Sequence, residues 1–269
     1  MFSNENGYPI ITDAFANDLA TAARTEPNRF GGYVVRDFAA APLGSYCDVS
    51  TDALIPRSEW RDRAETLEIT GATAEHVAEF ARVPILNQGQ RPYCWAYGTM
   101  GVLMVGYAAA GLPVPHLSAT SLAAKIKGYR DVGGWAGEAI EGNQKFGCST
   151  IDYWPEASLD RRHDTPEQRA NAALHIATEW AELPPRSFDA AASQLLRGRA
   201  VTLGLAWWGH LIYATKLVCM ADGGYGFLIR NSWGTNWEQG GKAILPERKA
   251  TPDEAVVIRS VSKYSAGTN

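Results

Sequence analysis

Residues 87 to 97 read Asn87-Gln88-Gly89-Gln90-Arg91-Pro92-Tyr93-Cys94-Trp95-Ala96-Tyr97, and this stretch decides how the rest of the chain is interpreted. A long apolar helix is predicted from Cys94 to Ala110, because Gly111 and Pro113 follow as helix-ending residues. Cys94 would then be the first helical residue, where free backbone N–H groups and the positive end of the helix dipole favour an anion. A thiol at such a position loses its proton more readily, which predicts a nucleophilic cysteine.

Attack on a carbonyl group creates an oxyanion, which needs hydrogen-bond donors near the sulfur. The N–H groups at the start of the helix can supply one donor. Gln88 lies six residues upstream of Cys94 in a glycine-containing loop, and we expect its side-chain amide to fold back over the cysteine. Gln88 is therefore the candidate for the second oxyanion donor.

The base must come from elsewhere in the chain, and a predicted hairpin supplies it. Strands are predicted over residues 211–218 and 225–230, with the turn signal Ala221-Asp222-Gly223-Gly224 between them. His210 leads into the first strand and Asn231 ends the second, so the hairpin brings them side by side. An amide oxygen can fix the tautomer and direction of an imidazole, which predicts a Cys94–His210–Asn231 set.

The order of the predicted elements indicates an α+β protein, with helices first and antiparallel strands afterwards. Helices are predicted over residues 13–23, capped by Thr12, and over residues 73–82. A further strand is predicted over residues 200–206.

Thr165-Pro166-Glu167-Gln168 is typical of a helix start, with a capping threonine followed by proline. We expect this helix to continue through a series of apolar residues spaced along one face: Ala172, Ala173, Ile176, Trp180 and Leu183.

Composition excludes several classes of protein. The chain has 269 residues with a net charge of −4, and its basic residues are scattered, so no nucleic-acid or membrane partner is expected. No run approaches the roughly 18 apolar residues of a membrane span. The start of the chain lacks the features of a secretory signal. The four cysteines (Cys47, Cys94, Cys148 and Cys219) form no disulfide-scaffold or zinc pattern. We expect no metal or organic cofactor, and a cytoplasmic or particle-associated protein.

Several motifs together resemble the papain and cathepsin family of cysteine peptidases. The stretch around Cys94 resembles the family's nucleophile motif, and Gly209-His210 is similar to its histidine motif. The segment from Asn231 to Gly241 resembles its asparagine motif, and Ile55-Pro56-Arg57-Ser58-Glu59-Trp60 the start of the mature enzymes. Leu117-Ser118 and Gly133-Gly134-Trp135 match in the right order. The resemblance covers residues 55–247.

The resemblance implies a papain-like two-lobe fold. A helical lobe is expected at about residues 85–185 and a lobe built on an antiparallel sheet or barrel at about residues 186–260. It implies a catalytic domain over residues 55–269, preceded by an arm or short pro-like extension over residues 1–54. We expect this arm either to lie in the cleft or to be cut near Ile55, and a docking partner for the arm is also possible.

The resemblance also implies roles at single positions. Gln88 would be the oxyanion donor, and Gly133-Gly134 would present backbone to an extended peptide or protein substrate. Trp233 would shield the His210–Asn231 bond from water. The reaction implied is peptide-bond hydrolysis through a thiol acyl-enzyme.

Departures from the family pattern lead to further predictions. Arg91 and Asp131 fall where the family has two half-cystines, so an ion pair is predicted between them. Tyr93 replaces a small residue near the nucleophile and would reshape the substrate pocket. A long loop before His210 is reduced to Trp207-Trp208-Gly209, which makes Trp208 either a wall of the substrate cleft or part of the core between the lobes.

Two other functions are compatible with the same residues. An amidase or peptidoglycan hydrolase could use the same triad on a different bond. A papain-fold module with weak or no activity could serve as a structural or binding component, for example of a virion or a secretion assembly, and dock through its N-terminal arm.

Overall fold

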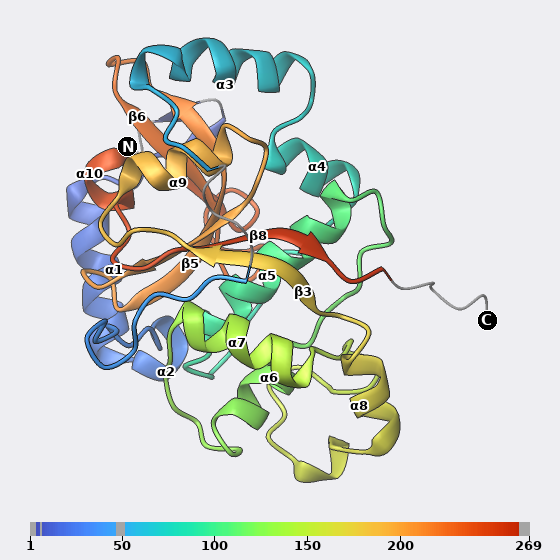
Figure 1. The fold of residues 1–269 in the computed structure, drawn as a ribbon. Helices are drawn as coiled ribbons and strands as arrows, with labels where there is room; N and C mark the ends of the chain where they lie inside the picture. The colour runs from blue at the N-terminus through green and yellow to red at the C-terminus, as the bar shows by residue number, and fades with distance from the viewer. Residues whose placement is uncertain (1–3, 6, 47–51, 264–269) are drawn as a thin grey trace.

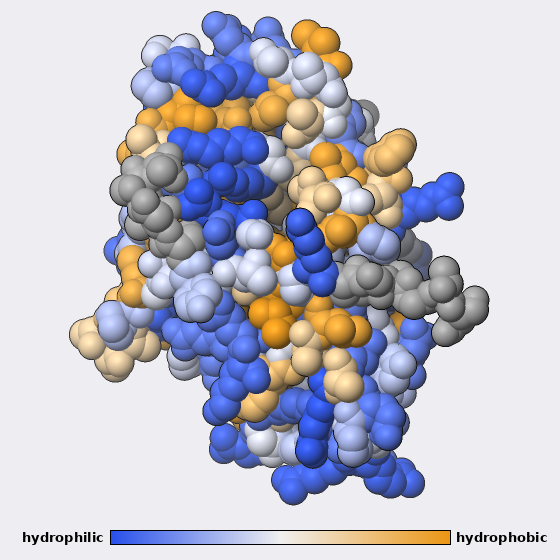
Figure 2. All heavy atoms as spheres, turned by 45° about the vertical axis from the view of Figure 1, so that its right-hand side comes forward, coloured by the Kyte–Doolittle hydropathy of each residue, from blue (hydrophilic) through white to orange (hydrophobic). Residues whose placement is uncertain are grey.

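The computed structural model describes residues 4–5, 7–46 and 52–263. Its helices are α1 (Asp13–Thr25), α2 (Pro27–Phe30), α3 (Trp60–Ile69), α4 (Ala74–Phe80), α5 (Cys94–Ala109), α6 (Ala119–Ile126), α7 (Ala136–Phe146), α8 (Pro166–Ala172), α9 (Phe188–Leu195) and α10 (Glu247–Ala250), with 3-10 turns η1 (Arg57–Glu59) and η2 (Arg161–His163). Within those ranges no helix is long and apolar enough to cross a membrane. On the face drawn in Figure 2, hydrophobic residues form separate patches among hydrophilic ones.

A six-stranded antiparallel sheet organises the second half of the chain. Its order is β3-β8-β4-β5-β6-β7, and β1 pairs only with β2 in a separate two-stranded sheet. The strands are β1 (Asn4–Glu5), β2 (Tyr8–Pro9), β3 (Ala177–Glu182), β4 (Val201–Leu205), β5 (His210–Cys219), β6 (Tyr225–Arg230), β7 (Lys242–Pro246) and β8 (Val256–Val261). Figure 1 shows α6, α7 and α8 grouped at one end of the molecule and α3 and α4 at the other. This is the predicted α+β fold, with helices before an antiparallel sheet.

Helix α5 runs through the core and carries the candidate nucleophile at its first residue. Most of its residues, on all sides of the helix, are buried. A helix that other elements enclose needs apolar residues on every side, which explains why this segment is almost entirely apolar. Glycines let it approach β5 closely: a Cβ atom at Gly98 would lie 2.4 Å from the Leu211 side chain, and one at Gly101 would lie 2.5 Å from the Tyr213 ring. The close packing places the start of α5 beside the start of β5.

Several predicted helix starts are confirmed at their caps. Thr12 accepts a hydrogen bond from the Phe15 N–H at the start of α1, and Thr73 accepts one from the His76 N–H at the start of α4. Helix α5 ends at Ala109, and Gly111 follows with a φ of +66°.

The helix predicted from Thr165 onward is wrong in its extent. Thr165 caps it as expected, but α8 ends at Ala172. Trp180 lies instead in β3, which pairs with β8 at Trp180↔Ile258. The periodic apolar residues fit a helix locally, and pairing with a strand about eighty residues later overrides that preference.

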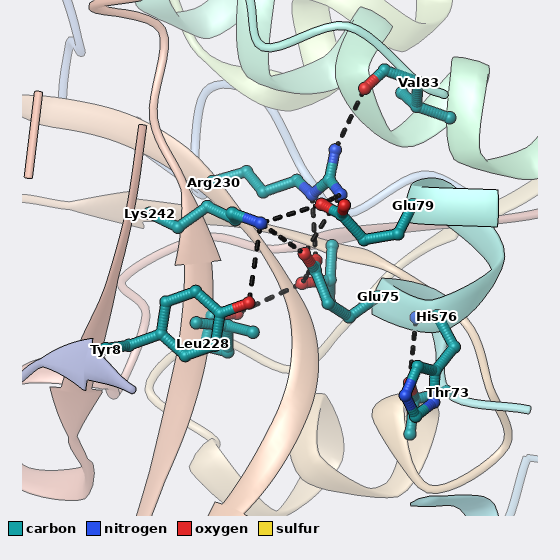
Figure 3. Close-up of polar contacts among 10 residues, drawn as sticks. Tyr8, Thr73, Glu75, His76, Glu79, Val83, Leu228, Arg230 and Lys242 are labelled. Carbon is teal, nitrogen blue, oxygen red and sulfur yellow. Dashed lines mark hydrogen bonds and ion pairs between the residues drawn. The ribbon is translucent and has the colours of Figure 1, made fainter. Parts of the chain in front are cut away.

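An ionic cluster around the buried side chains of Glu75 and Arg230 fastens α4 to the sheet (Figure 3). Arg230, at the end of β6, contacts the Glu75 carboxylate at 2.8 Å and the Glu79 carboxylate at 2.8 Å. Lys242 of β7 reaches the same two carboxylates at 3.2 and 2.7 Å, and Thr215 of β5 donates to Glu75 at 2.6 Å. We call Glu75, Glu79, Arg230 and Lys242 the sheet cluster.

The N-terminal arm follows the surface of the sheet half before it crosses toward α5. Ile10 forms a parallel bridge with Ile244 of β7, and Ile11 is fully buried. Ala16 and Leu19 of α1 pack into the same hydrophobic cluster as β4, β5 and β6. The arm is therefore part of the packed molecule, and its residues after α2 are delivered to the start of α5.

Candidate active site

Cys94 is fully buried at the start of α5. Tyr93 is the N-cap residue and makes no side-chain capping bond, so the first N–H groups of the helix remain available to other groups. Burial raises the pKa of the Cys94 thiol to about 12, and hydrogen bonds from the backbone N–H groups of Leu211, Trp95 and Cys94 itself act in the opposite direction. The sulfur thus lies beside the backbone of the residue that follows His210, and its surroundings favour the neutral thiol.

His210 and Asn231 meet as predicted. The Nε2 atom of His210 lies 2.8 Å from Oδ1 of Asn231. The same Oδ1 accepts the Ser232 N–H at 2.8 Å, which fixes that atom as the acceptor and makes Nε2 the protonated nitrogen of the ring. The other nitrogen, Nδ1, is buried and has no hydrogen-bond partner in the described part of the chain. An unprotonated, unpartnered nitrogen is a base ready to accept a proton.

Burial lowers the pKa of His210 to about 4, although the bond to Asn231 favours the charged form. The ring is therefore neutral near pH 7 in this arrangement. Both candidate reacting groups are held in their uncharged forms by the same cause, which is exclusion of water.

Tryptophan rings enclose the imidazole. The Trp233 ring centroid lies 4.8 Å from that of His210, and the Trp208 centroid lies 5.0 Å from it. Trp208 is buried within the hydrophobic cluster of the sheet half, so of the two interpretations the core one describes its packing. Phe30 of the arm packs edge-on against Trp233 at 5.1 Å.

Gln88 is held rigidly between two segments. Its backbone N–H donates to the Ser232 carbonyl at 2.8 Å, and its Oε1 accepts the Ser232 hydroxyl at 2.6 Å. Because Oε1 is the acceptor, Nε2 points the other way and donates to the carbonyl of Gly31 at 3.1 Å and to that of Arg91 at 2.8 Å. The predicted oxyanion donor thus already binds two peptide carbonyls, and one of them, that of Gly31, belongs to the arm.

The arm lies across Gln88, Gly134 and Gly209, and we call the surface that these residues form the groove. A position of this kind is the first of the two outcomes expected for the arm. The Gly134 N–H donates to the Gly32 carbonyl at 3.0 Å, and the Val34 N–H donates to the Gly134 carbonyl at 2.9 Å. Tyr33, between these two arm residues, donates its N–H to the Gly209 carbonyl at 3.2 Å. The backbone of Gly134 therefore pairs with residues 32–34 of the arm, and its pairing with a substrate stays a prediction.

Two glycines make this approach possible. Gly32 has a φ of +118°, and a Cβ atom on it would lie 2.3 Å from the Pro92 carbonyl oxygen. A Cβ atom on Gly133 would lie 2.5 Å from the Gly32 carbonyl oxygen. A side chain at either position would clash with backbone atoms, so the arm or the backbone beside it would have to shift.

The predicted ion pair between Arg91 and Asp131 is confirmed, with Nη1 and Oδ2 2.8 Å apart. Tyr93 is fully buried and donates its hydroxyl to the Arg130 carbonyl at 2.8 Å, while its neighbour Pro92 meets the arm. Cys94, Cys148 and Cys219 are free thiols, and Cys47 lies outside the described residues.

Sequence reasoning missed two groups of the site. Ser232 positions both Gln88 and Asn231, and it could have been found because it follows Asn231 directly in the motif. The Gly209 carbonyl binds the arm, and a backbone group of this kind leaves no signal in the residue types.

No family model matches the sequence, and no curated protein matches it. Solved structures do. The chain is similar to procathepsin L2 proteinase from the larval midgut of Tenebrio molitor (15% identity, TM-score 0.64, 95% of this chain and 84% of that chain). It is similar to xylellain, a cysteine protease from Xylella fastidiosa (17% identity, TM-score 0.60, 86% and 96%), and to a recombinant stem bromelain precursor (18% identity, TM-score 0.57, 97% and 85%).

These structural neighbours are papain-like cysteine proteases, and the likeness extends over most of the chain. Identities of this size establish the arrangement of the backbone. The chain therefore has the α+β fold of the papain-like cysteine proteases.

Proposed function

We propose that the chain is a cysteine peptidase in which Cys94 is the nucleophile, His210 the base and Asn231 the residue that orients the base. The observation that carries the proposal is the tautomer of His210. Nε2 is bound to Asn231 at 2.8 Å, which leaves Nδ1 unprotonated and without a hydrogen-bond partner among the described residues. A structural histidine in a core normally uses both nitrogens, whereas a base must keep one of them free.

The first half of the reaction forms an acyl-enzyme. Nδ1 of His210 takes the thiol proton of Cys94, and the sulfur attacks the carbonyl carbon of the scissile peptide. The carbonyl π electrons move to oxygen, which accepts hydrogen bonds from Gln88 Nε2 and from the backbone N–H at the start of α5. The C–N bond then breaks, and the imidazolium gives its proton to the leaving amine.

The second half releases the acyl group. Water replaces the amine, His210 takes one of its protons, and the oxygen attacks the thioester carbon. The C–S bond breaks and the proton returns to sulfur, so the enzyme is regenerated. Asn231 keeps the ring in one tautomer through both steps, and Trp233 and Trp208 exclude water from the His210–Asn231 bond.

The described arrangement is the latent state of this enzyme. Gly31 presents its carbonyl to Gln88, and residues 32–34 hold the backbone positions of Gly134 and Gly209 that an extended substrate needs. Cys94 and His210 are both 0% exposed. Removal of the arm from the groove returns water to the site. The neutral pair can then become a thiolate and an imidazolium.

Alkylation by iodoacetamide tests the proposal on the full chain. Gly32→Ala should displace the arm, because the added methyl group meets the Pro92 carbonyl at a strained backbone angle. We expect Cys94 to be alkylated at pH 6 on the order of tenfold faster in this variant than in the wild type. Gly71→Ala is the matched control, since its φ of +67° is also strained but nothing lies within 4 Å of the new methyl group.

His210→Ala, added to Gly32→Ala, should abolish the selective reaction of Cys94 and lower peptide cleavage by about 10²–10⁴-fold. Mass spectrometry that finds Cys94, Cys148 and Cys219 labelled at similar rates in the Gly32→Ala variant would refute the peptidase and favour a binding module.

A further inference from the structure

A cavity of about 310 Å³ lies between the C-terminal part of α5 and the end of β8. Apolar residues of these two elements form one part of its wall. The other part carries cationic side chains from the turn before β4 and from β8 and the residues after it: Arg197, Arg199, Arg259 and Lys263. We call these four side chains and the cavity the basic pocket. Its charge is opposite in sign to that of the whole chain, which is −4.

A tight turn between α9 and β4 places two arginines on the wall of the basic pocket. The N–H groups of Arg197 and Arg199 both donate to the Gln194 carbonyl, at 3.0 and 3.1 Å. Gly198 between them has a φ of +74°, and a Cβ atom on it would lie 2.8 Å from the Ala72 carbonyl oxygen. Glycine suits this position for both reasons, so the sequence Arg-Gly-Arg gives a fixed turn that carries both cations.

Protein groups hold the two guanidinium groups in place. Arg197 donates through Nη1 to the Ser193 carbonyl at 2.9 Å and through Nη2 to the Ala53 carbonyl at 2.6 Å. Arg199 donates through Nη1 to Oδ1 of Asp52 at 3.1 Å. Because these side chains are ordered by the protein itself, a ligand that binds them bears less of the cost of ordering them.

The negative charge beside the basic pocket does not balance its cations. Asp52 is shared, with one oxygen 3.1 Å from Nη1 of Arg199 and the other 4.0 Å from Nη1 of Arg259. Arg197 and Lys263 form no ion pair with a carboxylate of the described residues, and the bonds of Arg197 end on neutral carbonyls. Burial lowers the pKa of Arg197, and the charges of nearby arginines lower it further, against the opposing charge of Asp52.

The end of α5 does not supply the missing acceptors. Carbonyl groups at the C-terminus of a helix carry partial negative charge. Here the carbonyls of residues 106–108 each already accept an N–H group of residues 110–112, at 3.0 Å. The helix contributes instead an apolar wall, which includes Val105, Ala109 and Leu112.

We propose that the basic pocket binds a phosphate group, either as free inorganic phosphate or as the monoester of a small organic molecule. A phosphate dianion supplies two negative charges, which matches the two cations that have no carboxylate, whereas a carboxylate supplies one. Guanidinium groups also donate in pairs to phosphate oxygens. The organic part of a monoester would lie on the apolar wall. The proposal is independent of the peptidase function, because Cys94, His210 and Asn231 are not part of the pocket.

The first test is a calorimetric titration of the full chain at neutral pH, with the ionic strength held constant by sodium chloride. Inorganic phosphate should bind about tenfold or more tightly than acetate, because it carries the greater charge. Arg197→Gln should weaken phosphate binding about tenfold. Arg162→Gln removes the same charge from a side chain that is 88% exposed and outside the pocket, and should change nothing.

The same titration distinguishes the two sources of the phosphate group. Tighter binding of phenyl phosphate than of inorganic phosphate would support a monoester, because the ring gains contact with the apolar wall. The reverse order would support free phosphate. Equal binding of phosphate and acetate, or an unchanged affinity in Arg197→Gln, would overturn the site.

The second test locates the site in the wild-type protein. Phenylglyoxal modifies arginine side chains, and mass spectrometry measures the rate at each position. With phosphate at about ten times its dissociation constant, modification of Arg197 should slow about tenfold, because only the unoccupied fraction reacts. Arg162 should react at the same rate with and without phosphate. Equal protection of Arg162 and Arg197, or protection of neither, would overturn the proposal.

A second variant covers the case in which Arg197→Gln fails to fold, as judged by circular dichroism. Lys263 is exposed, so Lys263→Gln should leave the fold intact. We expect it to weaken phosphate binding about threefold, since an exposed ammonium group contributes less than a partly buried guanidinium. An affinity equal to that of the wild type would count against the basic pocket as the binding site.

Discussion

The sheet cluster sets two carboxylates against two cations, whereas the arm cluster, which is Arg36 with Glu182 and Glu254, sets two carboxylates against one cation. Both contain a buried arginine, yet their buried carboxylates behave in opposite ways. Burial opposes ionisation of Glu75, but hydrogen bonding and charge from Arg230 prevail, and the pKa of Glu75 falls to about 2. Burial prevails at Glu254, where the pKa rises to about 7 although the N–H groups of Gly137 and Ala136 and the charge of Arg36 oppose it. In the sheet cluster the cations are sufficient to keep Glu75 ionised, whereas the single cation of the arm cluster does not offset the burial of Glu254.

The two clusters also differ in the segments that carry their cations. Arg230 and Lys242 lie on adjacent strands and their carboxylate partners on α4, so the sheet cluster is broken only when α4 detaches from the sheet or the sheet unfolds. Arg36 lies on the arm, which is outside the six-stranded sheet, and in the active state proposed above the arm leaves and water reaches Glu182 and Glu254. The same interaction is permanent in one place and reversible in the other.

The largest effect is expected where the sheet cluster is broken. Arg230→Met leaves Glu75 buried without its arginine and should lower the free energy of unfolding by about 3–5 kcal/mol. Urea denaturation measures the loss. Arg162→Met is the control, because the Arg162 side chain is 88% exposed and its pair with Asp160 contributes little. A loss as small as that of the control would contradict the contrast between the clusters.

The pH dependence of stability probes Glu254. Its pKa is about 7 in the folded protein against an ordinary value of 4.5, so the folded state holds the proton more tightly. This stabilises the fold in full below about pH 4.5, and the contribution is lost as the pH rises through about 7, by on the order of 3 kcal/mol. Wild type should therefore weaken relative to Glu254→Gln between pH 5 and pH 8. Parallel curves for the two proteins would show that Glu254 titrates normally.

Arg36→Gln should cost less global stability than Arg230→Met, because its two carboxylates can reach water when the arm lifts. Hydrogen exchange of residues 31–36 should rise while that of β5 and β6 stays unchanged. Equal losses of unfolding free energy for the Arg36 and Arg230 variants would mean that the arm cluster is as permanent as the sheet cluster.

The smallest effect is expected at the Arg91–Asp131 pair. Its side chains are 30% and 29% exposed, so Asp131→Asn should change the free energy of unfolding by at most about 1 kcal/mol. Denaturation of this variant sets the scale for a partly exposed pair. A loss above that of Arg36→Gln would reverse the ranking of buried and exposed ion pairs in this molecule.

The core of the site was predictable because it depends on local signals. Cys94 precedes a long apolar run, and a turn at Asp222 brings His210 and Asn231 together, so spacing alone indicates the geometry. The arm cluster was not predictable, because Glu182 at the end of β3 and Glu254 just before β8 become neighbours only through the pairing of β3 with β8.

The fold, like the site, has features that local sequence decides and features that only distant pairing decides. Thr12, Thr73 and Thr165 cap helices at the expected residues, since capping is decided within a few residues. The segment around Trp180 suits a helix or a strand, and only the distant β8 decides between them. Pairing of Tyr33 with Gly134 is likewise a contact between segments about one hundred residues apart, which no local pattern encodes.

Because Phe30 of the arm contacts Trp233, the fluorescence of Trp233 should report whether the arm is in place. Phe30 belongs to the arm and covers one side of an indole that lies against the imidazole of His210. When the arm leaves, water replaces the phenyl ring, and indole emission moves to longer wavelength. Opening of the groove can therefore be followed in real time without any label, and Trp233→Phe identifies the part of the signal that comes from this ring.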